Sequence, residues 1–123
     1  MLSSARPMAF VATADAARAR AFYESTLGLK VVDDSPFALV LDSAGITIRV
    51  QKVEAVEAHP YTALGWEVAD VAAEVRALTA RGVAFQRYPG MTQDDLGIWT
   101  SPSGARIAWF RDPDGNVLSL SGG

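Results

Sequence analysis

The stretch WFRDPDGNVLSLS, residues 109–121, predicts how the C-terminal part of the chain folds. Its centre, Asp112-Pro-Asp-Gly115, separates two apolar runs. Aspartate side chains accept hydrogen bonds from nearby backbone N–H groups, and glycine tolerates the left-handed conformation, so this sequence is typical of a tight turn. We therefore expect a hairpin whose strands cover residues 105–110 and 116–120.

The order of elements that leads to this hairpin occurs twice along the chain. An aspartate precedes each predicted helix, where its side chain accepts bonds from free N–H groups, and a glycine follows the helix as a left-handed cap. The first copy has a strand from Pro7, a helix over Ala16–Leu27 between Asp15 and Gly28, strands over 29–33, 37–41 and 46–50, and a type I turn at Asp42–Gly45. The second has a strand over 62–68, a helix over Val71–Arg81 between Asp70 and Gly82, strands over 83–87 and 98–100, and the hairpin.

This repetition favours an α+β fold built from two βαβββ modules in a single domain, residues 1–123. Module 1 covers about residues 7–50, a connector covers 51–60, and module 2 covers about residues 61–121. Apolar side chains alternate along the strands and form a stripe on each helix, which predicts that each helix packs on one face of a mixed sheet. Two such curved sheets can enclose a shared cavity, with the helices on the outer face.

Composition and charge limit the kinds of partner. The chain has 123 residues, a formal net charge of −3 and no basic cluster, which disfavours nucleic-acid binding. It contains no cysteine, so neither a disulfide nor a thiolate-ligated metal is available. No apolar run approaches the ~20 residues that span a bilayer, and the N-terminus lacks a secretory signal. We therefore expect no membrane contact and a cytoplasmic location.

Three segments carry a resemblance to a known family: ARAFYESTLGLKVV (residues 19–32), LGWEVADVAAEVRALTARGVAF (residues 64–85) and WFRDPDGNVLSLS. In their content and spacing they resemble the vicinal oxygen chelate superfamily, which includes glyoxalase, bleomycin-resistance proteins and extradiol dioxygenases. The resemblance covers nearly the whole chain, and the Phe-x-Asp-Pro-Asp-Gly-Asn element is a specific part of it. It implies the fold of paired βαβββ modules.

The resemblance also implies where metal-dependent members hold a divalent ion. The matching positions here carry Met8 (or Phe10, if the register slips by two), Arg49, Ala63 and Ser119. Such ions need carboxylates, imidazoles or thiolates, and none of these side chains supplies one. The only histidine, His59, lies in the connector. We therefore expect no metal and no cofactor, and metal-dependent glyoxalase or dioxygenase activity is disfavoured.

Strand alternation indicates which side chains face the expected cavity. The set mixes aromatic and small residues with a few polar groups, as ligand pockets commonly do. Its members are Met8, Phe10, Phe37, Arg49, Gln51, Ala63, Glu67, Trp109 and Ser119. The opposite parity predicts a core of Val11, Ile48, Leu64, Trp66, Val68, Leu118 and Leu120. Arg49 and Glu67 either pair with each other or face a ligand, and His59 is either exposed connector or a proton carrier at the cavity mouth.

Three hypotheses of function follow. The first is a metal-free small-molecule-binding protein of the glyoxalase and bleomycin-resistance type, which holds an aromatic or cationic organic ligand; the resemblance implies a homodimer. The alternative is a metal-independent isomerase or lyase acting on a small carbonyl compound. Glu67 would then be the general acid or base and Arg49 would stabilise an oxyanion, so both are candidate catalytic residues. The third is a purely structural role, with side chains filling the cavity.

Overall fold

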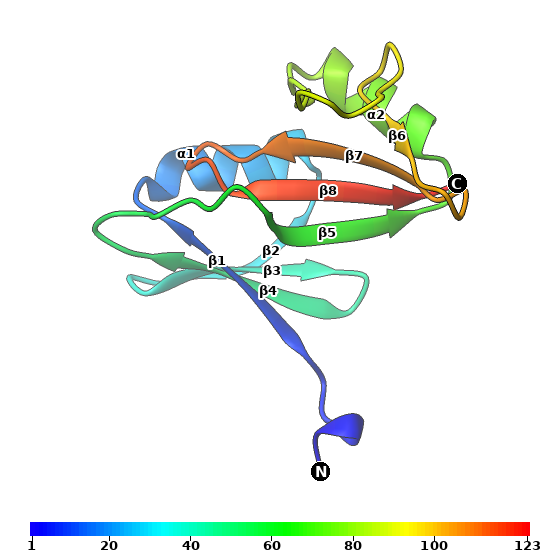
Figure 1. Cartoon of the computed structure of the whole chain (residues 1–123). Coiled ribbons are helices and arrows are strands. Elements are labelled where there is room, and N and C mark those ends of the chain that lie inside the picture. The colour runs from blue at the N-terminus through cyan, green and yellow to red at the C-terminus, as the bar shows by residue number, and fades with distance from the viewer. The chain divides into compact units, whose positions relative to one another are not determined.

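Two four-stranded sheets with the same strand order form the framework of the chain (Figure 1). In this computed structural model, which describes residues 1–123, the first sheet has the order β1-β4-β3-β2 and the second has the order β5-β8-β7-β6. The chain divides into unit 1, Met1–Ala58, and unit 2, His59–Gly123. Each unit contains one of the sheets, and we describe each by itself.

Unit 1 follows the predicted βαβββ order. Its elements are the 3-10 turn Leu2–Ser4, β1 (Met8–Thr13), α1 (Ala16–Arg20), a π-helical segment η2 (Ala21–Thr26), β2 (Lys30–Asp34), β3 (Ala38–Ser43) and β4 (Ile46–Lys52). Strand β1 pairs with β4 in parallel, whereas β3 pairs antiparallel with both of its neighbours. The sheet is therefore mixed, and the predicted α+β class with two βαβββ modules is confirmed.

The predicted helix over Ala16–Leu27 is present, but its second half is wider than an α-helix. The side chain of Asp15 accepts a hydrogen bond from the N–H of Arg18 at 3.1 Å and caps the first turn, as expected. In the π-helical segment, the N–H of Leu27 donates to the carbonyl of Phe22 at 2.9 Å. Gly28, with φ of +74°, then ends the helix.

The turn between β3 and β4 differs from the prediction. Ser43 pairs with Ile46, which leaves only Ala44 and Gly45 as the connecting residues. Both have positive φ, 50° and 84°, so the turn is of type I′ rather than the expected type I. Two-residue hairpin loops favour this type because its twist matches the right-handed twist of the strands.

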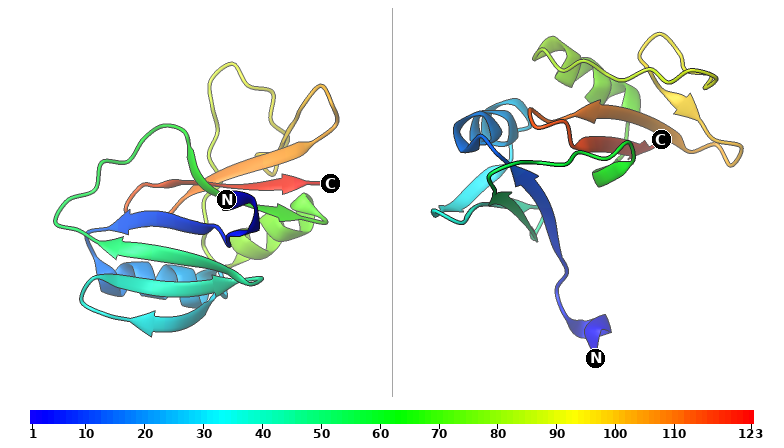
Figure 2. Two further views of the ribbon diagram at one scale, coloured as in Figure 1. Left: turned by 90° about the horizontal axis from the view of Figure 1, so that it is seen from below. Right: turned by 60° about the vertical axis from the view of Figure 1, so that its left-hand side comes forward.

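Buried apolar side chains lie on one face of the first sheet. They stand opposite one another in register on β1, β3 and β4, and comprise Val11, Leu39, Leu41, Ile48 and Val50. Ala19 and Tyr23, from α1 and η2, are fully buried as well. Both views of Figure 2 show this helical segment beside the sheet. The predicted core positions Val11 and Ile48 are therefore confirmed.

Unit 2 repeats the arrangement. Its elements are β5 (Thr62–Val68), α2 (Val71–Ala80), β6 (Trp99–Thr100), β7 (Arg106–Arg111) and β8 (Val117–Gly122). Asp70 caps α2 by accepting a hydrogen bond from the N–H of Ala73 at 3.0 Å. Helix α2 buries one apolar stripe, Val71, Val75 and Leu78, and contacts β7 and β8. No helix of the chain is both long enough and apolar enough to cross a membrane.

The core of unit 2 confirms part of the predicted set. Leu118 and Leu120 of β8 are buried opposite Phe110 and Ala108 of β7. The predicted core residues Leu64, Trp66 and Val68 are only half-buried. All three lie on β5, which is the edge strand of its sheet, so one side of each remains open to solvent.

The turn that predicted the hairpin is held by a buried side-chain network. One carboxylate oxygen of Asp112 accepts hydrogen bonds from the N–H groups of Asp114 and Asn116, both at 2.9 Å. The amide group of Asn116 donates to the other oxygen at 2.8 Å. Both partners of this last bond are almost fully buried. The β7–β8 turn is thus fixed by one carboxylate, as the sequence predicted.

The strand predicted over residues 83–87 is wrong. This segment lies beside β7 without joining the sheet, and its backbone bond to β7 runs from the N–H of Gln86 to the carbonyl of Trp109, at 2.8 Å. A side-chain bond from Arg111 to the Gln86 side-chain oxygen, at 3.4 Å, adds to it. The side chain of Gln93 takes the place of a strand partner. Its amide group donates to the carbonyl of Gln86 at 2.9 Å, and its oxygen accepts from the N–H of Tyr88 at 2.8 Å. Because the Gln93 side chain satisfies these two backbone groups, they need no partner on a neighbouring strand.

Candidate functional site: an aromatic pocket in unit 2

Four of the predicted site residues lie together on unit 1. Met8 and Phe10 of β1 and Arg49 and Gln51 of β4 occupy the sheet face opposite the buried core, because Phe10 stands opposite Arg49 in register. Met8 and Phe10 are about half exposed, at 48% and 51%. Phe37 precedes β3 and is 76% exposed. Unit 1 therefore presents apolar and cationic groups side by side on an open surface.

The alternation predicted along β5 is interrupted by a β-bulge. Thr62 stands opposite Val117 of β8, and Leu64 stands opposite Leu118, so Ala63 is an extra residue without a partner. Simple alternation therefore does not assign a face to Ala63, and its place in the site stays a prediction. Thr62 lies on the same face as Val117.

The other predicted residues of unit 2 share that face. Ser119 stands opposite Gly65 on one side and opposite Trp109 on the other, so all three project from the same side of the sheet as Thr62. Glu67, two residues after Gly65, joins them and is exposed. Ser119 also closes the space above Gly65, because a Cβ at residue 65 would lie 2.5 Å from the Ser119 hydroxyl.

These residues do not fit a divalent metal ion. The family positions carry a thioether, a guanidinium, a methyl group and a hydroxyl, on Met8, Arg49, Ala63 and Ser119. Zinc, iron and manganese prefer imidazole, carboxylate or thiolate donors, and a guanidinium repels a cation. Within either unit, no three His, Cys, Asp or Glu side chains come together in a group that could hold an ion.

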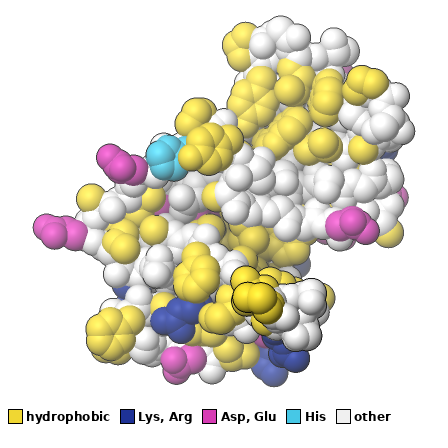
Figure 3. All heavy atoms as spheres, turned by 60° about the horizontal axis from the view of Figure 1, so that its bottom comes forward, with side chains coloured by type: hydrophobic (Ala, Val, Ile, Leu, Met, Phe, Trp, Pro, Cys, Tyr) yellow, Lys and Arg dark blue, Asp and Glu magenta, His cyan; other side chains and the backbone are white.

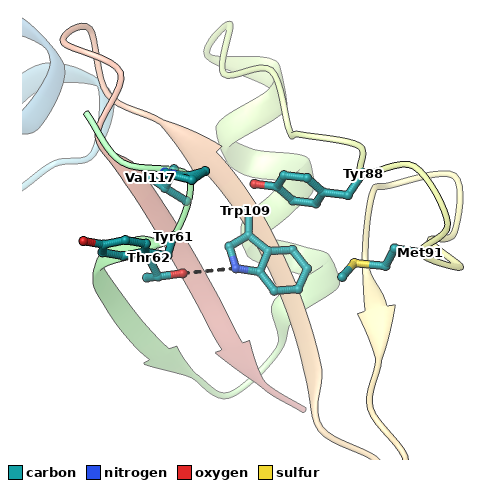
Figure 4. A pocket seen from close by; sticks show the side chains of 7 residues that line it. Tyr61, Thr62, Tyr88, Met91, Trp109 and Val117 are labelled. Atoms are coloured by element: carbon teal, nitrogen blue, oxygen red, sulfur yellow. Dashed lines mark hydrogen bonds between the residues drawn. The ribbon is translucent and has the colours of Figure 1, made fainter. Parts of the chain in front are cut away.

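A pocket of about 300 Å³ opens beside Trp109 (Figure 4). Its walls come from the start of β5, the loop after α2, β7 and β8, and none of the lining side chains is charged. The lining residues are Pro60, Tyr61, Thr62, Tyr88, Met91, Trp109 and Val117. The pocket brings one predicted site residue, Trp109, together with six that were not among the predicted site residues.

Trp109 is the best-supported wall of this pocket. Its indole N–H donates a hydrogen bond to the hydroxyl of Thr62 at 3.2 Å, drawn as the dashed line in Figure 4. The ring of Tyr88 meets it at 83° with ring centres 5.6 Å apart. The ring of Trp99 also packs against the indole, with ring centres 6.3 Å apart and planes inclined at 36°. Trp99 does not line the pocket. Three neighbours thus restrict the orientation of the indole.

Tyr88 and Met91 reach the pocket from the loop between α2 and β6. The Gln93 side chain holds the backbone of this loop and also donates to the carbonyl of Gly97 at 2.8 Å. The N–H of Met91 donates to the carbonyl of Tyr88 at 3.2 Å, which turns the chain between the two. The only signal in the sequence is the turn-forming pair Pro89-Gly90 between them, which predicts a bend but not its direction.

The only histidine lies at the edge of the same pocket. His59 stacks on Tyr61 with ring centres 5.2 Å apart and planes 2° from parallel. Figure 3 shows His59 at the surface beside an apolar ring. His59 is exposed, as the connector reading predicted, whereas a position at the mouth of the expected cavity and a role as proton carrier stay predictions.

Comparison with known families identifies the sequence pattern. The sequence model of the Glyoxalase/Bleomycin resistance protein/Dioxygenase superfamily matches residues 6–120, which is most of the chain. Among proteins with curated descriptions, none has a sequence that matches this chain.

Solved structures share the fold at low sequence identity. A lactoylglutathione lyase from Agrobacterium tumefaciens is similar with a TM-score of 0.76 and 18% identity, over 98% of this chain and 94% of that one. A bleomycin resistance determinant encoded on transposon Tn5 has a TM-score of 0.75 and 18% identity, over 97% and 98%. A glyoxalase family protein from Enterococcus faecalis has a TM-score of 0.76 and 18% identity, over 98% and 99%. At this identity the likeness establishes the fold alone.

Proposed function

Because the chain belongs to the Glyoxalase/Bleomycin resistance protein/Dioxygenase superfamily, we propose that it is a metal-free protein that binds a small organic molecule in the Trp109 pocket. The observation that carries this proposal is a pocket walled by Tyr61, Tyr88 and Trp109 with no charged lining residue. Its volume of about 300 Å³ lies at the lower end of the range for ligand pockets, which are mostly apolar and aromatic.

The metal-free part of the proposal rests on donor chemistry. The four positions that matching family members use for a metal carry Met8, Arg49, Ala63 and Ser119, and the chain has one histidine and no cysteine. A binding role without metal needs none of these donors. Elemental analysis of the purified chain tests this part separately, because one tightly held metal ion per subunit would contradict it.

Ligand binding is tested by tryptophan fluorescence during titration with a panel of aromatic and cationic compounds. The chain has three tryptophans, so two variants separate the signals. We expect a binding compound to quench wild-type emission, and Trp109→Phe to lose most of that quenching. The control Trp66→Phe, altered on the opposite face of the sheet, should retain it. If Trp109→Phe is quenched as strongly as the wild type, the ligand does not occupy this pocket.

The proposal includes a homodimer located in the cytoplasm. Met8 and Phe10 are exposed apolar side chains on one face of the first sheet, which a second copy would cover favourably. Light scattering across a dilution series tests the assembly. A chain that remains monomeric at high micromolar concentration would contradict the dimer and leave the pocket proposal intact.

A further inference from the structure

We propose that the Trp109 pocket is an aromatic cage for an alkylammonium group, so that the ligand is an organic cation. This inference rests on the proposed function, since it assigns a ligand class to the same pocket. The proposed function allows any small organic molecule in the pocket. The inference is narrower, because it requires that the bound group carries a positive charge.

The angle between the walls favours a rounded cationic group over a flat ring. Stacking of a planar ligand between two rings needs parallel faces on either side of it. Tyr88 and Trp109 are instead 83° apart, with centres at 5.6 Å, so they meet as a corner. A compact group such as trimethylammonium can contact both sides of a corner. Aromatic cages are an established setting for quaternary and methylated ammonium groups.

The charge of the lining points the same way. None of the seven lining residues is cationic, so nothing in the pocket repels an ammonium group, and nothing would pair with a carboxylate or phosphate. The indole N–H of Trp109 is not available to an anion, because Thr62 already accepts it at 3.2 Å. The remaining donors are the neutral hydroxyls of Tyr61, Thr62 and Tyr88, so an anion entering the pocket would lose hydration without gaining a compensating charge, which is costly. A cation would instead gain the negative faces of the rings, and the chain's net charge of −3 favours its approach.

The cage is held in shape before a ligand arrives. Thr62 fixes the indole from one end, and Trp99 packs against it at 6.3 Å. Tyr88 is held through its N–H, which donates to the side chain of Gln93 at 2.8 Å. Met91 adds a polarisable sulfur to the lining. Rigid walls reduce the ordering cost of binding, which matters for a small ligand.

The test compares choline with 3,3-dimethyl-1-butanol, which replaces the charged nitrogen by carbon at the same shape. Both are titrated into the full-length chain under the same buffer conditions and followed by the indole N–H signals in NMR. We expect choline to bind at least about tenfold more tightly, as a desolvated cation–π contact implies. Equal affinity would overturn the cage. Failure of both to bind would also overturn it.

Variants assign the preference to the walls. Tyr88→Leu and Trp109→Leu should reduce the choline preference to about twofold or less, whereas Tyr88→Phe should keep it, because the ring and not the hydroxyl supplies the attraction. Trp66→Phe, outside the pocket, should leave both affinities unchanged. A full choline preference in folded Tyr88→Leu would contradict the proposal.

The outcomes separate this inference from the proposed function. If choline and its neutral analogue bind equally, and both lose affinity in Trp109→Leu, the pocket binds small molecules without selecting charge. If the fluorescence panel yields no ligand that depends on Trp109, both proposals fail together.

Discussion

The indole N–H of Trp109 donates to the hydroxyl of Thr62, a residue 47 positions earlier in the chain. This bond ties β7, the first strand of the β7–β8 hairpin, to the start of β5. It is possible because the bulge at Ala63 turns Thr62 onto the face from which Trp109 projects. We expect Thr62→Val to release the indole, lower the free energy of unfolding by about 1 kcal/mol and weaken ligand binding.

Thr62→Ser is the matched control, because serine retains the accepting oxygen. NMR of the indole N–H of Trp109 provides a readout that stability alone does not move. Its resonance should shift toward the value of a water-exposed indole in Thr62→Val and stay in place in Thr62→Ser. An unchanged resonance in the valine variant would mean that the bond does not hold the ring.

Ala44 is the one non-glycine residue with positive φ, at 50°. A Cβ in this region is disfavoured, and type I′ turns prefer asparagine or glycine at this position. We predict that Ala44→Gly raises the free energy of unfolding by about 0.5–1 kcal/mol, measured by urea denaturation. Gly45→Ala, at φ of 84°, should lower it. Loss of stability in Ala44→Gly would argue against the type I′ turn.

Asp112 satisfies two backbone N–H groups and the amide of Asn116 in an almost fully buried turn. Removing its carboxylate leaves buried donors without acceptors, so Asp112→Ala should cost about 2–3 kcal/mol of unfolding free energy. Asp95→Ala, in an exposed loop, should change stability little. A cost below about 1 kcal/mol for Asp112→Ala would mean that water replaces the carboxylate.

Gln93 makes three side-chain hydrogen bonds, to the N–H of Tyr88 and to the carbonyls of Gln86 and Gly97. We expect Gln93→Ala to loosen the loop that carries Tyr88 and Met91, and to weaken ligand binding more than it lowers global stability. Hydrogen exchange at the Tyr88 amide should become faster, whereas exchange in β7 and β8 should not change. The exposed neighbour Thr92 offers the control Thr92→Ala. Equal protection of Tyr88 in both variants would contradict this role.

Asp34 gives the chain an acid-sensitive contact. Its carboxylate accepts hydrogen bonds from Lys52 and Arg20, and these lower the pKa of Asp34 below its ordinary value. A lowered folded-state pKa means that the stabilisation is present above the unfolded value of about 3.9 and is lost as the pH falls through the folded value. We therefore expect Asp34→Asn to be less stable than the wild type at pH 7, with a gap that narrows below about pH 4.

Urea unfolding at a series of pH values measures this gap. Asp33→Asn is the matched control, because the exposed Asp33 carboxylate makes no ion pair. High salt should also reduce the Asp34 effect, since the contact is exposed and screened. A gap that persists unchanged at pH 3 would mean that the Asp34 side chain acts through packing and not through its charge.

The elements that could be predicted from sequence are those with local signals. The Asp15 and Asp70 caps mark the helix starts, and the Asp112–Gly115 turn defines the final hairpin. Alternation within uninterrupted strands was also sufficient to place Val11 and Ile48 in the core.

The pocket depends on features without a local signal. The bulge at Ala63 interrupts the alternation along β5, so counting back from Gly65 did not select Thr62, which lines the pocket. Tyr88 and Met91 lie in a loop, where no periodicity applies. The loop is shaped by Gln93, whose partner groups are defined only once the chain has folded.

The single residue inserted at Ala63 also matters for anyone who would redesign this scaffold as a metalloprotein. The family pattern would place a new imidazole at residue 63, which has no paired residue on β8. An imidazole at residue 62 would emerge on the side from which the residue 119 side chain projects. For a chelating pair with residue 119, the register therefore supports residue 62 as the position of the new imidazole.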